Sequence, residues 1–140
     1  MTTTDTARET FERDAERHYH SWALDLTMEL RKLDSDDEDT ADEARESLTN
    51  DSVLSVQAQI HNYRTETYEW EILLGTGGPA MRVYVTTDED GTVERAEYQF
   101  QDWGTEWFAP RGQDAALVEQ FASLFYLVKY GCRIRPARRD

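Results

Sequence analysis

The sequence predicts a single α+β domain in which helices cover one face of a four-stranded antiparallel sheet. Apolar residues recur at helical spacing near both ends of the chain, whereas apolar and polar residues alternate through residues 53–101, as they do in strands. The 140 residues suffice for one hydrophobic core, and an aromatic content of 11% is typical of a folded chain. The expected order is a long N-terminal helix, a short second helix, a four-stranded meander and a C-terminal helix packed on one sheet face.

A long amphipathic helix is predicted over residues 8–33. Its apolar residues follow one another at steps of three or four, namely Phe11, Ala15, Tyr19, Trp22, Leu26, Leu30 and Leu33. Charged residues dominate the opposite face, where solvent is expected. Leu24 and Met28 lie off the apolar stripe, so this helix is expected to touch a second surface there.

An acidic run follows the first helix and leads into the second. It holds seven carboxylates: Asp34, Asp36, Asp37, Glu38, Asp39, Asp42 and Glu43. Thr40 and Glu43 have the spacing of a capping box, which predicts a short helix with Thr40 as its N-cap that ends near Leu48. Residues 50–52 (Asn-Asp-Ser) then predict a turn before the first strand.

Four segments of alternating apolar and polar residues predict the strands of an antiparallel meander. They are residues 53–61, residues 67–74, a segment that begins at Met81, and residues 93–101. The glycine-rich stretch 75–79 joins the second strand to the third, and residues 88–91 are expected to form a hairpin turn. Arg82 is expected to hold Glu71 or Asp102 across the sheet.

The C-terminal part is predicted to contain an irregular aromatic segment, a helix and a basic tail. The helix is expected from about Asp114 to Tyr130, with Gly131 as its C-cap. The tail beyond it is expected to be flexible. The chain therefore divides into one acidic α+β domain, residues 1–132, and a basic tail, residues 133–140.

The sequence contains no motif typical of a catalytic, cofactor or metal site. The stretch 75–79 lacks the Gly-Lys-Ser/Thr ending of a phosphate loop and joins two strands where a dinucleotide fold needs a helix. His18 and His20 point about 200° apart on a helix and cannot share one metal. The acidic run lacks the glycine and the spaced ligands of an EF-hand. We therefore expect no enzyme activity, cofactor or metal, and Cys132, the single cysteine, is expected to be a plain thiol.

Three aromatic residues form the best candidate for a small binding site: Trp103, Trp107 and Phe108. Such side chains can stack on a base, a sugar or a partner's arginine. The competing interpretation is that they close the end of the sheet as part of the core. An enzyme that acts on a small ligand at this segment is the third-ranked hypothesis for function.

The formal net charge is −14, from 29 acidic and 15 basic residues. Residues 129–140 contain five basic residues and one acidic residue, so the rest of the chain carries −18. Such a surface repels nucleic acid and anionic membranes and attracts cationic partners. Because only Lys32 and Lys129 are lysines, adaptation to salt is an alternative explanation of the acidity. No apolar run approaches the roughly 20 residues that span a bilayer, and a cytoplasmic protein is expected.

Three segments stand out in combination: Leu54-Ser55-Val56, residues 72–82 (Ile-Leu-Leu-Gly-Thr-Gly-Gly-Pro-Ala-Met-Arg) and residues 98–105 (Tyr-Gln-Phe-Gln-Asp-Trp-Gly-Thr). Together they resemble small uncharacterised proteins of phages, plasmids and prophages. Those proteins carry a Gly-Gly-Pro-Ala-x-Arg strand turn, a Gln-Asp-Trp segment and a closing aromatic-rich helix. The likeness covers about residues 50–130. It implies a mobile-element origin and carries no activity with it.

The charge and the resemblance together predict an anti-defence protein of the anti-CRISPR or antirestriction type. Carboxylates three and four residues apart on a helix lie about 5–6 Å apart and can imitate the closely spaced phosphates of a duplex. The predicted partner-binding row begins with Glu9, Glu12, Glu16, Asp25 and Glu29 and continues through the seven carboxylates of the acidic run. The expected partner is a basic nucleic-acid-binding protein, a nuclease or a CRISPR effector, and not nucleic acid itself. Arg8, Arg13 and Arg17 dilute the row.

The alternative hypothesis is a structural or regulatory protein–protein interaction module of a phage or plasmid. In this interpretation the chain forms a homodimer through its first helix, with Leu24 and Met28 in the contact.

Overall fold

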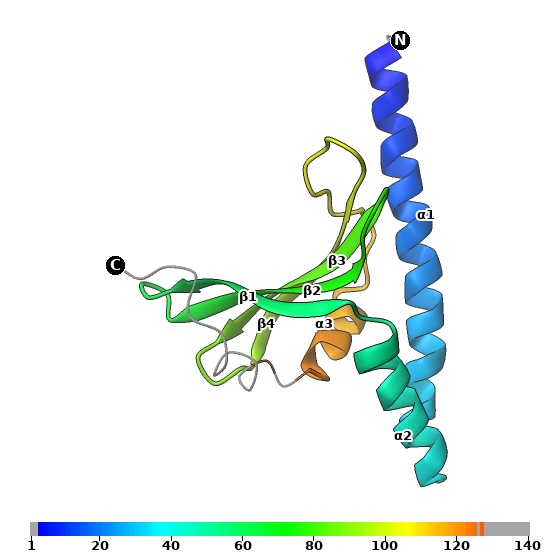
Figure 1. Cartoon of the computed structure of the whole chain (residues 1–140), viewed down its shortest axis with the longest axis vertical. Helices are drawn as coiled ribbons and strands as arrows, with labels where there is room; N and C mark the ends of the chain where they lie inside the picture. Colours follow the sequence, from blue (N-terminus) through cyan, green and yellow to red (C-terminus); the bar gives the residue numbers. More distant parts are fainter. Residues whose placement is uncertain (1–2, 126, 128–140) are drawn as a thin grey trace.

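The computed structural model describes residues 3–125 and residue 127, and it has the α+β architecture that the sequence predicts (Figure 1). Two helices precede the sheet and a third follows it. The elements are α1 (Thr3–Lys32), α2 (Glu38–Glu46), a π-helical turn η1 (Ser47–Asp51), β1 (Ser55–Asn62), β2 (Thr67–Gly75), β3 (Ala80–Asp88), β4 (Val93–Gln101) and α3 (Ala115–Ser123). Within the described ranges, no helix is both long enough and apolar enough to cross a membrane.

The strands form a meander in the order β1-β2-β3-β4, and each is antiparallel to the next. Each connection is four residues long, which suits antiparallel neighbours. One deviation from the predicted alternation is a bulge in β1, where the register shifts between Ala58 and Ile60. Because an extra residue reverses the facing of the side chains that follow, Ile60 is exposed and His61 is buried.

α1 and α3 pack on one face of the sheet, and the core lies between the sheet and these two helices. In Figure 1, α3 lies between the sheet and α1, and both helices contact β4. The covered face contributes side chains that are at most 2% exposed, among them Trp70, Ile72, Val83, Val85, Tyr98 and Phe100. The Trp70 indole N–H donates to the Thr87 hydroxyl at 3.0 Å, so burying this polar atom leaves no unmet donor.

The predicted apolar stripe of α1 is confirmed, because Ala15, Tyr19, Leu26 and Leu30 are buried in the core. The Asp114 N–H donates to the Tyr19 hydroxyl at 2.8 Å and thereby ties α1 to the start of α3. The rings of Trp22 and Phe121 meet edge to face at 5.3 Å, a favoured geometry for an aromatic pair. These contacts fix the middle of α1 against the rest of the domain.

The start of α2 differs from the prediction because Asp37, and not Thr40, caps the helix. The Asp37 carboxylate accepts hydrogen bonds from the Asp39 N–H at 3.2 Å and from the Thr40 hydroxyl at 2.8 Å. Since the Thr40 hydroxyl is used as this donor, the helix begins earlier, at Glu38. At its other end α2 continues directly into η1, where a turn over residues 50–52 was predicted.

The outer helices also differ in length from the prediction. α1 begins at Thr3 and not near residue 8, and α3 ends at Ser123. After Ser123, the N–H groups of Leu124 and Phe125 donate to the carbonyls three residues earlier, which tightens the last turn. Leu127 is again helical, and the rest of the predicted helix end (residues 126 and 128–130), the predicted cap at Gly131, Cys132 and the basic tail lie outside the described residues.

Candidate functional site

The second face of the sheet is polar, and α1 and α3 pack on the opposite face. We call the polar face the open face. Its three central rows, read from β2 through β3 to β4, are Glu69, Thr86 and Arg95; Glu71, Tyr84 and Glu97; and Leu73, Arg82 and Gln99. Neighbours within a row pair directly across strands, so their side chains lie close enough to bond.

Arg82 lies at the centre of a hydrogen-bonded network on the open face. Its Nη1 donates to Glu71 Oε2 at 2.8 Å and its Nε donates to Gln99 Oε1 at 2.7 Å. The guanidinium carbon lies 4.5 Å from the Tyr84 ring and 4.1 Å from the Trp107 ring, so two aromatic side chains also hold the cation. The pairing of Arg82 with Glu71 confirms one of the two predicted partners.

Tyr84 continues this network towards β2. Its hydroxyl donates to Glu69 Oε1 at 2.7 Å. Burial raises the pKa of the Tyr84 phenol, and the neighbouring Glu69 carboxylate raises it further. Tyr84 therefore stays protonated above pH 10.0, where an ordinary tyrosine ionises, and keeps donating to Glu69 there.

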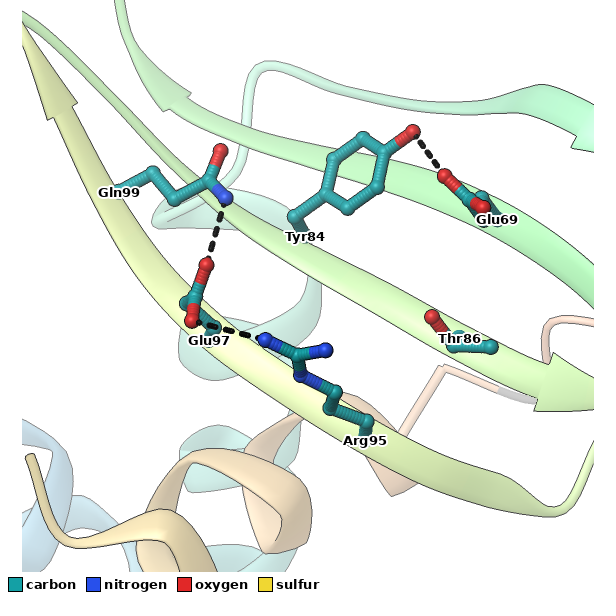
Figure 2. Close-up of a pocket in the computed structure, with 6 residues that line it drawn as sticks. All are labelled: Glu69, Tyr84, Thr86, Arg95, Glu97 and Gln99. Atoms are coloured by element: carbon teal, nitrogen blue, oxygen red, sulfur yellow. Dashed lines mark hydrogen bonds and ion pairs between the residues drawn. The ribbon is translucent and has the colours of Figure 1, made fainter. Parts of the chain in front are cut away.

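A hollow of about 250 Å³ opens beside Tyr84, above Thr86, and we call it the Thr86 hollow (Figure 2). Thr86 is the shortest side chain in its row, between Glu69 and Arg95, and this difference in length creates the space. Tyr84, Glu97 and Gln99 complete the lining. Gln99 Nε2 donates to Glu97 Oε1 at 2.8 Å, which fixes the carboxylate, while Arg95 Nη2 approaches Glu97 Oε2 only to 3.5 Å. The lining is polar and mostly held in place by bonds on the protein itself.

The three aromatic residues singled out from the sequence do not form one cluster. Phe108 packs on Phe11 of α1 at 5.5 Å and exchanges two backbone hydrogen bonds with Phe100, so it belongs to the core. Trp107 covers Arg82 on the open face. Trp103 is 82% exposed. Packing at the end of the sheet thus describes Phe108, whereas Trp107 stacks on an arginine of the same chain, and stacking of these residues on a partner's arginine, a base or a sugar stays a prediction.

Trp103 lies directly over the glycine-rich connection between β2 and β3. A Cβ atom on Gly78 would overlap the Trp103 indole nitrogen, so the ring in this position lies against a glycine and would have to move for any other residue. The two turns meet because Ala80 pairs with Gln101, which places the start of β3 beside the end of β4. Asp102, the other predicted partner of Arg82, instead accepts from the Trp103 N–H at 2.8 Å.

The predicted acidic row on α1 is divided by the helix geometry. Glu16 and Asp25 are nine residues apart, about two and a half helical turns, and therefore lie on opposite sides of α1. Two of the five carboxylates are also paired: Glu12 with Arg8 at 2.8 Å and Glu29 with Lys32 at 3.0 Å. Glu9, Glu12 and Glu16 share one side, and Asp25 and Glu29 share the other, so the five residues do not form a continuous row.

The acidic run forms a compact surface at the end of α1 and along α2, and we call residues 34–46 the acidic tip. Figure 1 shows α2 beside the C-terminal end of α1, where Ala44 and Leu48 pack inward. The tip carries eight acidic residues and one arginine, a formal charge of −7. All eight are exposed: Asp34, Asp36, Asp37, Glu38, Asp39, Asp42, Glu43 and Glu46. None of them forms an ion pair within the described part of the molecule.

Elsewhere in the described residues, His61 is a titratable side chain with buried surroundings. His61 Nε2 lies 3.3 Å from Glu89 Oε2, and its ring stacks on Tyr68 at 4.1 Å. Its Nδ1 is the one buried side-chain nitrogen or oxygen without a hydrogen-bond partner in the described structure. Among residues 3–125 and 127, no group of three or more His, Cys, Asp and Glu side chains could hold a metal ion.

The chain matches no family model, no curated protein and no solved structure. Three surfaces of the described chain are therefore the candidates for function: the open face, the acidic tip and the exposed side of α1.

Proposed function

We propose that the protein inhibits a basic nucleic-acid-binding protein by binding it through the acidic tip. The observation that carries this proposal is the contrast between the acidic tip and the other acidic surfaces. Carboxylates on α1 and on the open face are partly neutralised by arginine or lysine, whereas those of residues 34–46 are exposed and unpaired within the described chain. Unpaired surface charge is available to a cationic partner and speeds its encounter with the tip.

The arrangement of α2 supports imitation of a nucleic acid. Asp39 and Asp42 are three residues apart, and Asp42 and Glu43 each lie four residues after Glu38 and Asp39, so these carboxylates lie on neighbouring parts of one helix surface. Helical neighbours three and four apart are separated by about 5–6 Å. A protein channel that binds the dense negative charge of a duplex would meet similar charge here.

The sequence resemblance of residues 50–130 to phage, plasmid and prophage proteins implies a mobile-element origin, which supports an anti-defence role for the proposed inhibitor. The partner class is then a restriction nuclease or a CRISPR effector. In this mechanism the acidic tip occupies the nucleic-acid channel and no bond is made or broken.

The proposal is tested by neutralising the acidic tip while its helix cap is kept. The test variant carries Asp36→Asn, Glu38→Gln, Asp39→Asn and Glu43→Gln, and it retains the Asp37 cap. We expect inhibition of DNA cleavage by a purified effector or restriction nuclease to weaken by on the order of 10- to 100-fold, because the attraction to the basic channel is reduced. Cleavage assays across an effector panel, with DNA competition, provide the measurement.

A matched control removes four exposed carboxylates elsewhere, with Glu66→Gln, Asp90→Asn, Glu94→Gln and Glu106→Gln. Both variants change the formal net charge from −14 to −10, so only the position of the lost charge differs. Equal weakening by both variants would show that net charge, and not the tip, is responsible. Full inhibition by the tip variant would rule out the tip as the binding surface.

A second candidate function, self-association through α1, is favoured by one specific observation. Leu24 and Met28 are 63% and 54% exposed although both are large and apolar. They are one helical turn apart and therefore adjacent on the outer side of α1. A regulatory or structural module that dimerises there would bury both residues.

A further inference from the structure

We propose that the Thr86 hollow binds the guanidinium group of an arginine side chain presented by a protein partner. The hollow lies on the open face and shares no residue with the acidic tip. The inference therefore goes beyond the proposed inhibitory function and stands or falls separately from it.

The first argument is the charge of the lining. Glu69 and Glu97 lie on β2 and β4, on either side of β3, and Arg95 is the one cationic side chain among the six lining residues. The lining therefore carries a formal charge of −1 when all three groups are ionised. Arg95 is 74% exposed and reaches Glu97 only at 3.5 Å, so it neutralises the carboxylate weakly. A cation is favoured over an anion in this space.

The second argument is unused hydrogen-bonding capacity. Glu69 Oε1 accepts from Tyr84, but no donor among the described residues bonds to Glu69 Oε2. Glu97 Oε2 has only the long contact to Arg95. A carboxylate can accept several hydrogen bonds, so both groups can receive further N–H donors without losing their present partners.

The third argument is that the same face already holds a guanidinium group in this way. Arg82 is bound by a carboxylate from β2, by a glutamine from β4 and by the rings of Tyr84 and Trp107. The Thr86 hollow repeats most of these features four residues further along β3, with acceptors offset by two residues on β2 and on β4. Glu69 and Glu97 replace Glu71 and Gln99, and Tyr84 borders both places.

These features favour guanidinium over an ammonium group. A guanidinium is planar, carries five N–H donors in a fixed arrangement and stacks on aromatic rings, and it is more weakly hydrated than ammonium. The oxygen acceptors here come from two strands and lie beside a tyrosine ring. An arginine at the surface of a partner protein supplies this group on a long apolar stem that can enter the hollow.

The experiment is a nuclear magnetic resonance titration of the full chain with N-acetyl-arginine amide. We expect shifts centred on Tyr84, Thr86 and Glu97, with weak affinity of about 1–10 mM, which is typical of a single side chain. N-acetyl-citrulline amide has the same shape without the charge and should not bind. N-acetyl-lysine amide should bind at least about threefold more weakly, since ammonium lacks the planar donor pair.

Four variants locate the site and give the sign of the ligand charge. Thr86→Phe fills the hollow and should abolish binding, whereas Thr86→Val keeps its shape and should leave binding within about twofold. Glu97→Gln should weaken binding at least about fivefold. Arg95→Gln removes the competing cation and should strengthen binding about twofold. Preserved spectra of each free variant establish that the sheet is intact.

The proposal is overturned if the citrulline analogue binds equally well, if Arg95→Gln abolishes binding, or if Thr86→Phe leaves it unchanged. It is also overturned if the lysine analogue binds as tightly or if no lining residue shifts. Free L-arginine distinguishes the source of the ligand: tighter binding of the free amino acid than of the amide would indicate a small-molecule site. None of these outcomes depends on inhibition by the acidic tip.

Discussion

At the scale of single residues, two tyrosines on opposite faces of the sheet are both held in the neutral form. Tyr98 is 1% exposed in the core, and burial alone raises its phenol pKa above the ordinary value of 10.0. For Tyr84 on the open face, burial is again the main cause, and the Glu69 carboxylate adds to it. A phenolate at Tyr98 would lack solvation, and a phenolate at Tyr84 would also face the Glu69 carboxylate.

These raised pKa values predict a loss of stability at alkaline pH. In the unfolded chain both phenols ionise near pH 10.0, whereas the folded chain keeps them protonated, so folding binds protons above that pH. The stabilisation is fully present below pH 10.0 and is lost as the pH rises towards the folded-state values. We expect tyrosinate absorbance from these two residues to appear together with unfolding. Tyr84→Phe with Tyr98→Phe should make the alkaline loss shallower. Early ionisation of all seven tyrosines in a folded protein would contradict this prediction.

Single residues also show which parts of the site can be predicted from the sequence and which cannot. The pairing of Arg82 with Glu71 was predictable, because opposite charges on adjacent strands face each other when the register is right. The Thr86 hollow was not, because it depends on the relative lengths of Thr86, Glu69 and Arg95 once they share a row. That row exists only after both registers are known. The separation of Trp103, Trp107 and Phe108 likewise depends on the path of an irregular segment.

At the scale of elements, one side-chain hydrogen bond joins the start of α3 to α1, beside the contact between the Trp22 and Phe121 rings. The Tyr19 hydroxyl accepts the Asp114 N–H at 2.8 Å, and Asp114 in turn caps α3 by accepting from the Leu117 N–H at 3.2 Å. The apolar stripe that buries Tyr19 follows from helical periodicity in the sequence. Its polar partner does not, because the two residues are 95 positions apart in the chain.

We expect Tyr19→Phe to lower the free energy of unfolding by about 1–2 kcal/mol, because the Asp114 N–H loses its acceptor while the packing of the ring is kept. Chemical denaturation of the variant measures this change. Tyr68→Phe is the matched control. The Tyr68 ring stacks on His61, and loss of its hydroxyl should lower the free energy of unfolding by less than about 0.5 kcal/mol. Equal effects of the two substitutions would contradict the role assigned to the Tyr19 hydroxyl.

Element positions were predictable where periodicity is long, and element ends were not. The four strands and the buried stripe of α1 match the prediction because alternation and helical spacing extend over many residues. The start of α2 at Glu38 does not, because Asp37 and Thr40 are both good caps and local hydrogen bonding decides between them. The bulge in β1 escaped prediction for a similar reason, since Ile60 fits the alternation of a regular strand.

At the scale of the whole molecule, charge distinguishes the two candidate functions. Two copies of a chain with a formal charge of −14 repel each other, whereas a basic partner is attracted. Dissolved salt screens both the repulsion and the attraction, and at physiological ionic strength charges more than about 8 Å apart interact only weakly. Self-association and partner binding must therefore respond to salt with opposite signs.

If α1 mediates a homodimer, dimerisation should strengthen as salt is raised, and Leu24→Gln with Met28→Gln should abolish it because the apolar contact is lost. Light scattering at low and high salt gives this readout. The matched control is Leu54→Gln, which replaces another exposed apolar residue away from α1. A protein that stays monomeric at every salt concentration excludes the dimer. Inhibition by the acidic tip should instead weaken as salt is raised.

The meander has a further consequence for how the chain reaches its native state. Each pair of neighbouring strands is joined by only four residues, so the sheet can form from segments that are adjacent in sequence. The bond from Asp114 to Tyr19 closes a loop of 95 residues. Because the entropy of closure grows with the logarithm of loop length, joining α1 to α3 directly would cost about 3 kcal/mol more than closing one hairpin. Forming the sheet first shortens the effective loop, and the docking of α1 then completes the core.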